Sequence, residues 1–130
     1  MSLKLTGLPM IWIEKDDNKK GFSFDKALEM FDKRFFFEME TGSHFYKREK
    51  VIRLKIENYM KLEGKFHVIF EVADHNGIPA SKYGQELLKI ISEYKRGTQF
   101  LVSPYAGLVT DPLGDWLAHY SGKTFSLKTV

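Results

Sequence analysis

The chain has 130 residues, of which 43% are hydrophobic and 15% aromatic, with no cysteine and a formal net charge of +3 at pH 7. This composition predicts a single soluble globular domain over residues 1–130, and it excludes a disordered tail, disulfides, thiolate metal sites and a cysteine nucleophile. The lack of cysteine and of a visible signal peptide favours a cytoplasmic location, and no apolar run is long enough to predict a transmembrane helix.

The amino-terminal third is predicted to contain a strand and a short helix. Residues 5–13 are interpreted as an edge strand, because glycine and proline interrupt them. Ser23 is a suitable N-cap for a helix whose apolar residues recur at intervals of three and four. Those residues are Phe24, Ala27, Leu28 and Phe31. Lys33 and Arg34 then fall at the carboxyl end of this helix, where cations are favoured.

Alternating apolar and polar residues predict three consecutive strands, joined by turns at 41–44 and 63–64. In the first, Phe35 and Phe37 face the core while Phe36 lies on the other face. The second and third alternate with the same period, which places Leu54 and Phe70 in the core. The three strands cover residues 35–40, 52–60 and 66–73. Together they predict an antiparallel meander with one dry face.

The remaining elements are two helices and two strands. A helix over 82–96, capped by Ser81, is expected to bury an apolar stripe that ends near Gly97. Asp111 followed by proline predicts a last short helix ending at Gly122. Strands are expected at 98–105 and 124–130. The fold class is therefore α+β, an antiparallel meander or a partly open OB-like barrel with two or three short helices.

Three groups of residues contain possible metal ligands, and none of them is favoured as a metal site. The first is Asp111, Asp115 and His119, which would share one helix face that points away from the apolar stripe. The second is His67, Glu71 and His75, which share a strand face, but neighbouring members of the group lie roughly 13 Å apart. The third begins at Asp74 and resembles the start of a calcium loop, but Gln85 stands where a bidentate glutamate is needed. The sequence predicts no metal and no cofactor.

The sequence carries no motif typical of nucleotide binding, zinc proteolysis or nucleophilic catalysis. Ser103 precedes a proline and has no histidine near it in the sequence. A binding module is therefore favoured over an enzyme.

Positive charge and aromatic residues are concentrated in one region. Residues 33–65 contain nine Lys or Arg and five Glu residues, and residues 33–50 alone contain five aromatic residues. Single-stranded nucleic acid is bound by aromatic rings that stack on bases and by cations that follow the phosphates. The residues predicted to form such a surface are Phe36, Tyr46, Lys47, Arg48, Lys50, Arg53, Lys55 and Tyr59.

Two other interpretations stay open. In the first, the glutamates of this region, among them Glu38 and Glu40, pair with neighbouring lysines, and the protein is a structural or protein-interaction domain. It would then be a homo-oligomer that uses the Phe-rich segment 35–39 or the edge around Trp12. In the second, the protein is a hydrolase that uses His67 or His119 with a carboxylate from elsewhere in the fold. The expected partners are thus single-stranded nucleic acid or a second copy of the chain, and no membrane.

Overall fold

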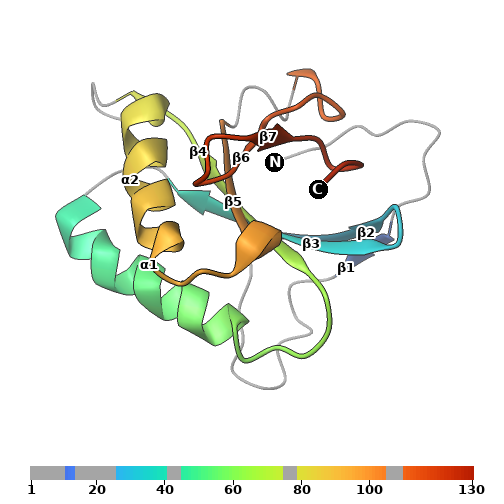
Figure 1. Ribbon diagram of the computed structural model, residues 1–130, viewed down its shortest axis with the longest axis horizontal. Coiled ribbons are helices and arrows are strands. Elements are labelled where there is room, and N and C mark those ends of the chain that lie inside the picture. The colour runs from blue at the N-terminus through green and yellow to red at the C-terminus, as the bar shows by residue number, and fades with distance from the viewer. Residues whose placement is uncertain (1–10, 14–25, 41–44, 75–78, 105–109) are drawn as a thin grey trace.

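The computed structural model of the chain describes residues 11–13, 26–40, 45–74, 79–104 and 110–130. Within them the fold is α+β, with one mixed open sheet, two α-helices and one 3-10 turn (Figure 1). The strands are β1 (Ile11–Ile13), β2 (Lys26–Met30), β3 (Lys33–Glu40), β4 (His67–Val72), β5 (Phe100–Pro104), β6 (Leu117–Ala118) and β7 (Thr124–Phe125). The helices are α1 (Phe45–Tyr59) and α2 (Ala80–Ser92), and η1 (Gly97–Gln99) is the 3-10 turn. No helix in these ranges is long and apolar enough to cross a membrane.

The strands lie in the sheet in the same order as in the sequence, from β1 to β7. β3, β4 and β5 run parallel, and every other neighbouring pair is antiparallel. Parallel neighbours need a crossover connection, which α1 and α2 supply. The sheet is open, because β1 and β7 each pair with a single neighbour in the described ranges. The predicted antiparallel meander is therefore wrong at its centre, and the OB-like barrel is not confirmed.

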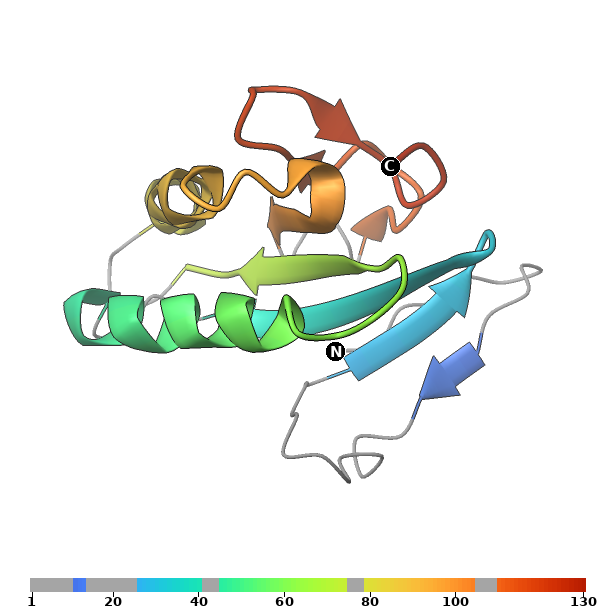
Figure 2. The same cartoon turned by 60° about the horizontal axis from the view of Figure 1, so that its bottom comes forward.

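Both faces of the sheet are covered by apolar packing. On one face, which we call the helix face, residues of α1 and α2 pack with Phe36, Phe70 and Val102. On the opposite face, Leu117 and Leu127 from the carboxyl-terminal segment pack with other residues of β2, β3, β4 and β5. Figure 2 shows α1 lying along β3 and β4, with β6 and β7 on the far side of the molecule from it.

The helix predicted to begin at Ser23 is instead strand β2 in its described part; Ser23 and Phe24 lie outside the described residues. Ala27 and Leu28 are both fully buried, but they pack on opposite faces of the sheet, as consecutive residues of a strand do. Phe31 and Asp32 have φ angles of 55° and 57°, and this pair of left-handed residues forms the two-residue turn into β3. Lys33 and Arg34 consequently begin a strand and do not end a helix.

The strand predicted over 52–60 is instead the helix α1 and the turn that follows it. Ile52, Ile56 and Tyr59 are buried at positions i, i+4 and i+7, which is one face of a helix. Leu54, which an alternating strand would bury with them, is 60% exposed. The prediction that Leu54 belongs to the core is therefore wrong.

β3 and β4 are buried on both faces, whereas the sequence predicted one solvated face for each. Phe35 and Phe37 pack on the opposite face, and Phe36 packs on the helix face with only 4% exposure. Phe70 is fully buried, as predicted, but the residues beside it on β4 are buried as well. Central parallel strands are covered on both sides, so they need no alternation. The three consecutive phenylalanines are core residues, so they are not available for a homo-oligomer interface.

α2 confirms the predicted helix and its buried stripe of Tyr83, Leu87, Ile90 and Ile91. Its first amide, on Ala80, donates to Asp74 Oδ1 at 2.7 Å, so Asp74 takes the capping role predicted for Ser81. Gly84 lets the helix approach the sheet closely, since a Cβ there would lie 3.3 Å from Val102 Cγ1. Lys95, with a φ of 51°, is the first left-handed residue after the helix, two positions before Gly97.

Residues 111–122 contain tight turns and β6, and the predicted helix is wrong. Gly114 N donates to Asp111 O and Trp116 N donates to Gly114 O, each at 3.0 Å. A Cβ at Gly114 would lie 2.5 Å from Trp116 Nε1 and 2.6 Å from Asp111 Oδ2, so these two exposed side chains would have to shift to admit it. Of the predicted apolar face, Leu117 is buried while Leu113 and Trp116 are exposed. Asp111, Asp115 and His119 consequently share no helix.

Candidate carboxylate–lysine site

Buried charged side chains occur near the carboxyl ends of two parallel strands. Among the described residues they are Glu38 and Glu40 on β3 and Glu71 on β4. Carboxylates are rarely buried unless they are paired or bound to a cation. In open sheets with parallel strands, ligands also bind beyond the carboxyl ends of these strands. This combination makes the carboxyl edge of β3, β4 and β5 the candidate site.

The pairing register assigns the three carboxylates to different faces. Glu38 and Glu40 alternate with Met39, so both point to the helix face that Phe36 also occupies. Glu71 pairs in register with Ser103, and both lie on the opposite face. Glu38 and Glu40 therefore form a pair, from which Glu71 is separated by the thickness of the sheet.

Lys55 of α1 connects the two carboxylates of this pair. Its Nζ lies 2.7 Å from Glu40 Oε1 and 3.6 Å from Glu38 Oε2. The Lys55 side chain is 28% exposed, whereas the two carboxylates that its ammonium group contacts are buried. We call Glu38, Glu40 and Lys55 the carboxylate–lysine site.

Tyr59, one helical turn after Lys55, completes the contacts around Glu38. Its hydroxyl donates to Glu38 Oε1 at 2.6 Å, and its ring contacts the rings of Phe36 and Phe66 at centroid distances of 5.4 and 6.3 Å. Tyr59 is 1% exposed. The sequence predicted Phe36 and Tyr59 on a solvent face where bases could stack. That placement is wrong, because both rings are buried in the core between α1 and the sheet.

Of the other residues of the predicted nucleic-acid surface, Lys50, Arg53 and Lys55 have described side chains, and Arg53 and Lys55 are engaged in ion pairs. Arg53 forms ion pairs with Glu49 at 3.0 Å and with Glu93 of α2 at 2.5 Å. The hydrogen bonds to Glu93 and then to Glu49 raise the pKa of Arg53 above its ordinary value. Lys50 is exposed on α1. The side chains of Tyr46, Lys47 and Arg48 lie outside the described residues.

The two histidines proposed for hydrolysis hold the backbone that precedes β5. His67 Nδ1 lies 2.7 Å from Thr98 O, and His119 Nε2 lies 2.9 Å from Gly97 O. Burial lowers the pKa of His67, which favours the neutral ring that donates to this carbonyl. His67 stands at the amino end of β4, away from the carboxyl edge that carries the carboxylates. This arrangement does not support an acid–base role for either histidine.

The sequence predicted no metal, and the structure allows this prediction to be examined only in the described ranges. No three His, Asp or Glu side chains in those ranges are arranged to hold a metal ion. Asp74 caps α2, and His75 and the rest of the calcium-like loop as far as residue 78 lie outside the described residues. A cation at the carboxylate–lysine site would need oxygen ligands in addition to those of Glu38 and Glu40.

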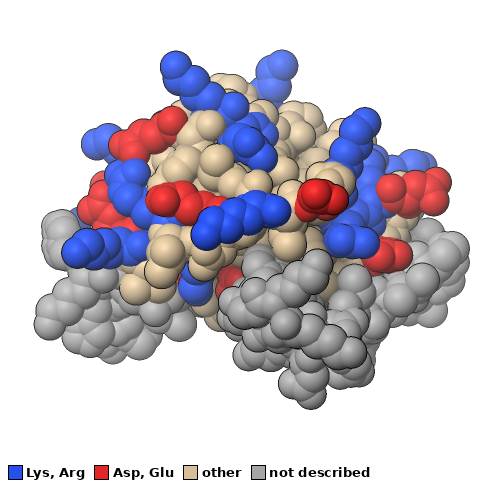
Figure 3. Space-filling model, turned by 90° about the horizontal axis from the view of Figure 1, so that it is seen from below, with Lys and Arg blue, Asp and Glu red and all other residues tan. Residues whose placement is uncertain are grey.

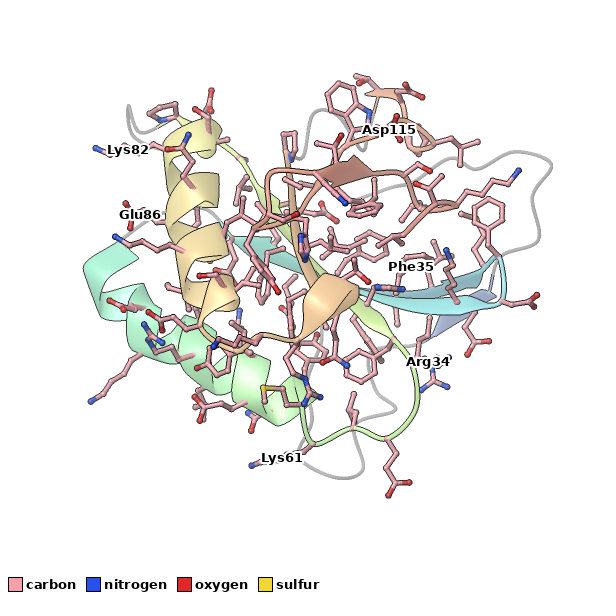
Figure 4. All side chains as sticks on the ribbon, in the orientation of Figure 1. Arg34, Phe35, Lys61, Lys82, Glu86 and Asp115 are labelled. Carbon is pink, nitrogen blue, oxygen red and sulfur yellow. The ribbon has the colours of Figure 1, made fainter. Side chains whose placement is uncertain are left out.

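The described surface carries mixed charge. Figure 3, seen from below, shows Lys and Arg side chains with Asp and Glu side chains among them. In Figure 4, Lys61, Lys82 and Glu86 point outward, whereas Phe35 points into the interior. On the face shown in Figure 3 the described cations therefore do not form one uniform basic patch.

Sequence reasoning named Lys55 and Tyr59 but gave Glu38 and Glu40 only a surface pairing role. The signal that could have identified them is the pattern Phe-Glu-Met-Glu at the end of an apolar strand, because acidic residues there extend a buried face. Lys55 and Tyr59 are separated by four residues, the spacing that places two side chains on one face of a helix. The four-residue spacing is informative only when residues 45–59 are recognised as a helix.

The chain matches no protein-family model, no curated protein and no solved structure.

Proposed function

We propose that the protein binds nucleic acid and hydrolyses its phosphodiester bonds at the carboxylate–lysine site, with Mg²⁺ as the cation. The observation that supports this proposal best is the contact of Lys55 Nζ with both Glu40 and Glu38, at 2.7 and 3.6 Å. These groups come from the carboxyl end of a parallel strand and from the helix that follows it, which is the edge where such folds bind ligands.

The chemistry of the three side chains suits a phosphodiester. Mg²⁺ is commonly bound through one or two carboxylates, with water and substrate phosphate oxygens as its other ligands. Glu38 and Glu40 supply the carboxylates, and the cation would polarise the phosphate and lower the pKa of a bound water. In this proposal the Lys55 ammonium would stabilise the negative charge that develops on the phosphate. Because the substrate would complete the coordination, purified protein is expected to hold no stoichiometric metal.

Nucleic acid is proposed as the substrate because it brings together the phosphodiester and the basic segment 33–65. A single strand is the form that the sequence analysis expected, and here it rests on the basic residues of this segment alone. The rings of Phe36 and Tyr59 are buried, so neither is proposed to stack on a base. Lys50, exposed on α1, remains a candidate for contact with the backbone phosphates.

The test is cleavage of a labelled single-stranded oligonucleotide, with Mg²⁺ or with a chelator. Glu40→Gln and Lys55→Met are each expected to lower the Mg²⁺-dependent rate by about 100-fold or more. Lys82→Met is the matched control, because Lys82 is exposed on α2 and points away from the site (Figure 4). Equal rates in Lys55→Met and wild type would overturn the assignment of the site.

Binding is measured separately from cleavage, by titrating the oligonucleotide in the presence of chelator at increasing salt. The logarithm of affinity should fall linearly with the logarithm of salt concentration, with a slope of about −0.7 for each phosphate neutralised. Binding without Mg²⁺-dependent cleavage would support nucleic acid as the partner and overturn the proposed hydrolysis. Failure to bind even at low salt would overturn both.

A further inference from the structure

The side of α1 that faces away from the core carries exposed apolar side chains. Leu54 is 60% exposed and Val51, one turn before it, is 39% exposed. Ile52 and Ile56 are fully buried on the opposite side of the same helix. Figure 1 shows α1 at the margin of the molecule, with the sheet and α2 on one side of it. The other side of α1 is therefore a candidate surface for a partner.

Exposed charges of both signs accompany these apolar residues. Lys50 precedes Leu54 by four residues and Glu57 follows it by three, and both are exposed. Because each residue turns the helix by about 100°, Lys50 and Glu57 lie about 40° and 60° from Leu54 on the same flank. Val51 lies about 60° from Leu54 on the other flank. We call Lys50, Val51, Leu54 and Glu57 the outer face of α1.

The outer face of α1 is complementary to a copy of itself. If two α1 helices pack antiparallel about a two-fold axis at Leu54, the two leucines meet on the axis and like flanks face each other. Lys50 lies about 6 Å along the helix on one side of the axis, and Glu57 about 4.5 Å on the other side. The axis therefore brings Lys50 beside Glu57 of the partner subunit, and it forms this ion pair twice.

We propose that the protein forms a homodimer through the outer face of α1, with antiparallel helices, Leu54 at the centre and two ion pairs between Lys50 and Glu57 of the partner subunit. A second copy is favoured over an unrelated partner because one helix supplies both charges at positions that pair under two-fold symmetry. The inference goes beyond the proposed function, since none of these residues belongs to the carboxylate–lysine site.

The dimer is expected to be weak. Packed helices cross at an angle, which confines the contact to the turns near Leu54. The interface is thus small beside the roughly 800 Å² per partner of a stable complex, and exposed ion pairs add little affinity. We expect a Kd on the order of 0.1 mM, so that the chain is a monomer in the low micromolar range.

The first test is analytical ultracentrifugation of the full chain, without nucleic acid, from about 10 μM to about 1 mM. Wild type should pass from monomer to dimer over this range. Leu54→Gln should weaken the dimer about tenfold or more, because it removes the apolar contact on the axis. Leu113→Gln is the matched control, since Leu113 is an exposed leucine outside α1, and it should dimerise as wild type does. Wild type that stays monomeric throughout would overturn the proposal.

The second test examines the ion pairs by charge reversal. Lys50→Glu and Glu57→Lys each turn two attractive pairs into two repulsive ones, so each variant alone should dimerise about tenfold more weakly. An equimolar mixture of the two variants should recover the wild-type affinity, because both pairs of the heterodimer again join opposite charges. A mixture that associates no better than the separate variants would overturn this arrangement of the helices.

Controls separate the ion pairs from net charge and from folding. Lys82→Glu and Glu86→Lys make the same charge changes at exposed positions of α2 (Figure 4), and each should leave the dimer unchanged. Glu57→Lys also removes the acceptor of the Tyr94 hydroxyl, which lies 2.9 Å from Glu57 Oε2. Tyr94→Phe removes that bond alone and should dimerise as wild type does. Equal weakening by the α2 variants would show that net charge governs association, and would overturn the proposed pairing.

Discussion

At the scale of single residues, His67 shows how burial and one hydrogen bond set the properties of a side chain. It lies at the start of β4, with its ring stacked on Phe35 at a centroid distance of 5.5 Å. Burial lowers the pKa of His67 most; the bond to Thr98 O opposes this shift, and the charge of Lys33 adds to it. The neutral ring is thus the form that the folded protein stabilises.

Stability is therefore expected to fall in acid. The unfolded chain takes up a proton at His67 below about pH 6.5, whereas the folded chain does so only at a lower pH. The contribution of His67 is thus present above pH 6.5 and is lost as the pH falls through the lowered pKa. His67→Asn keeps an N–H near the Nδ1 position but does not titrate, so urea unfolding at several pH values should show a flatter pH dependence for it. An equally steep loss in the variant would show that another group is responsible.

At the scale of elements, the apolar residues of α1 fit both the period of a strand and the period of a helix. Ile52, Leu54 and Ile56 alternate as in a strand, yet Ile52, Ile56 and Tyr59 are spaced as in a helix. A short apolar run cannot distinguish these possibilities. The structure distinguishes them, because Leu54 is exposed while Tyr59, which the strand assignment placed on a solvent face, is buried with Ile52 and Ile56.

The two assignments of α1 predict different results for two truncations. Ile56→Ala removes buried groups from the helix-face core and should lower the free energy of unfolding by about 2–5 kcal/mol. Leu54→Ala should change it by less than about 0.5 kcal/mol, as for an exposed position. Chemical denaturation of both variants checks this. Comparable losses would restore the strand assignment, which expected both residues in the core.

β4, β5 and α2 were predictable because each carries one unambiguous signal: a long apolar run or a stripe of period 3.6 with turn residues at its ends. β2 was not, because Ala27 and Leu28 are buried on opposite faces of a sheet whose second layer comes from residues about ninety positions later. The same limit applies to the candidate site. The Phe-Glu-Met-Glu pattern of β3 could indicate a buried carboxylate, but its partner Lys55 depends on where α1 packs.

At the scale of the whole molecule, the most deeply enclosed strand is β4. It has parallel neighbours on both sides and apolar packing on both faces. β7 is a two-residue strand at the end of the described sheet, with β6 as its one neighbour. The hydrogen bonds of β4 are therefore expected to be much better protected from solvent than those of β7.

Native-state hydrogen exchange should reproduce this gradient. Amides of β4 are expected to exchange only through global unfolding, whereas amides of β6 and β7 should exchange through local opening at much lower free energy. Nuclear magnetic resonance or mass spectrometry resolves the two regions. Equal protection in β4 and β7 would mean that the carboxyl-terminal strands unfold together with the centre of the sheet.

The order of the strands, which is the same in space as along the chain, also bears on how the protein is assembled during synthesis. Each strand from β2 onward has its first partner already made when it leaves the ribosome, because that partner precedes it in the sequence. No strand has to be inserted later between two that are already paired. The nascent chain can thus extend the growing edge one strand at a time. The opposite face stays uncovered until Leu117 and Leu127 emerge, so a nascent chain that lacks them exposes apolar residues of β2 to β5 and carries an aggregation risk.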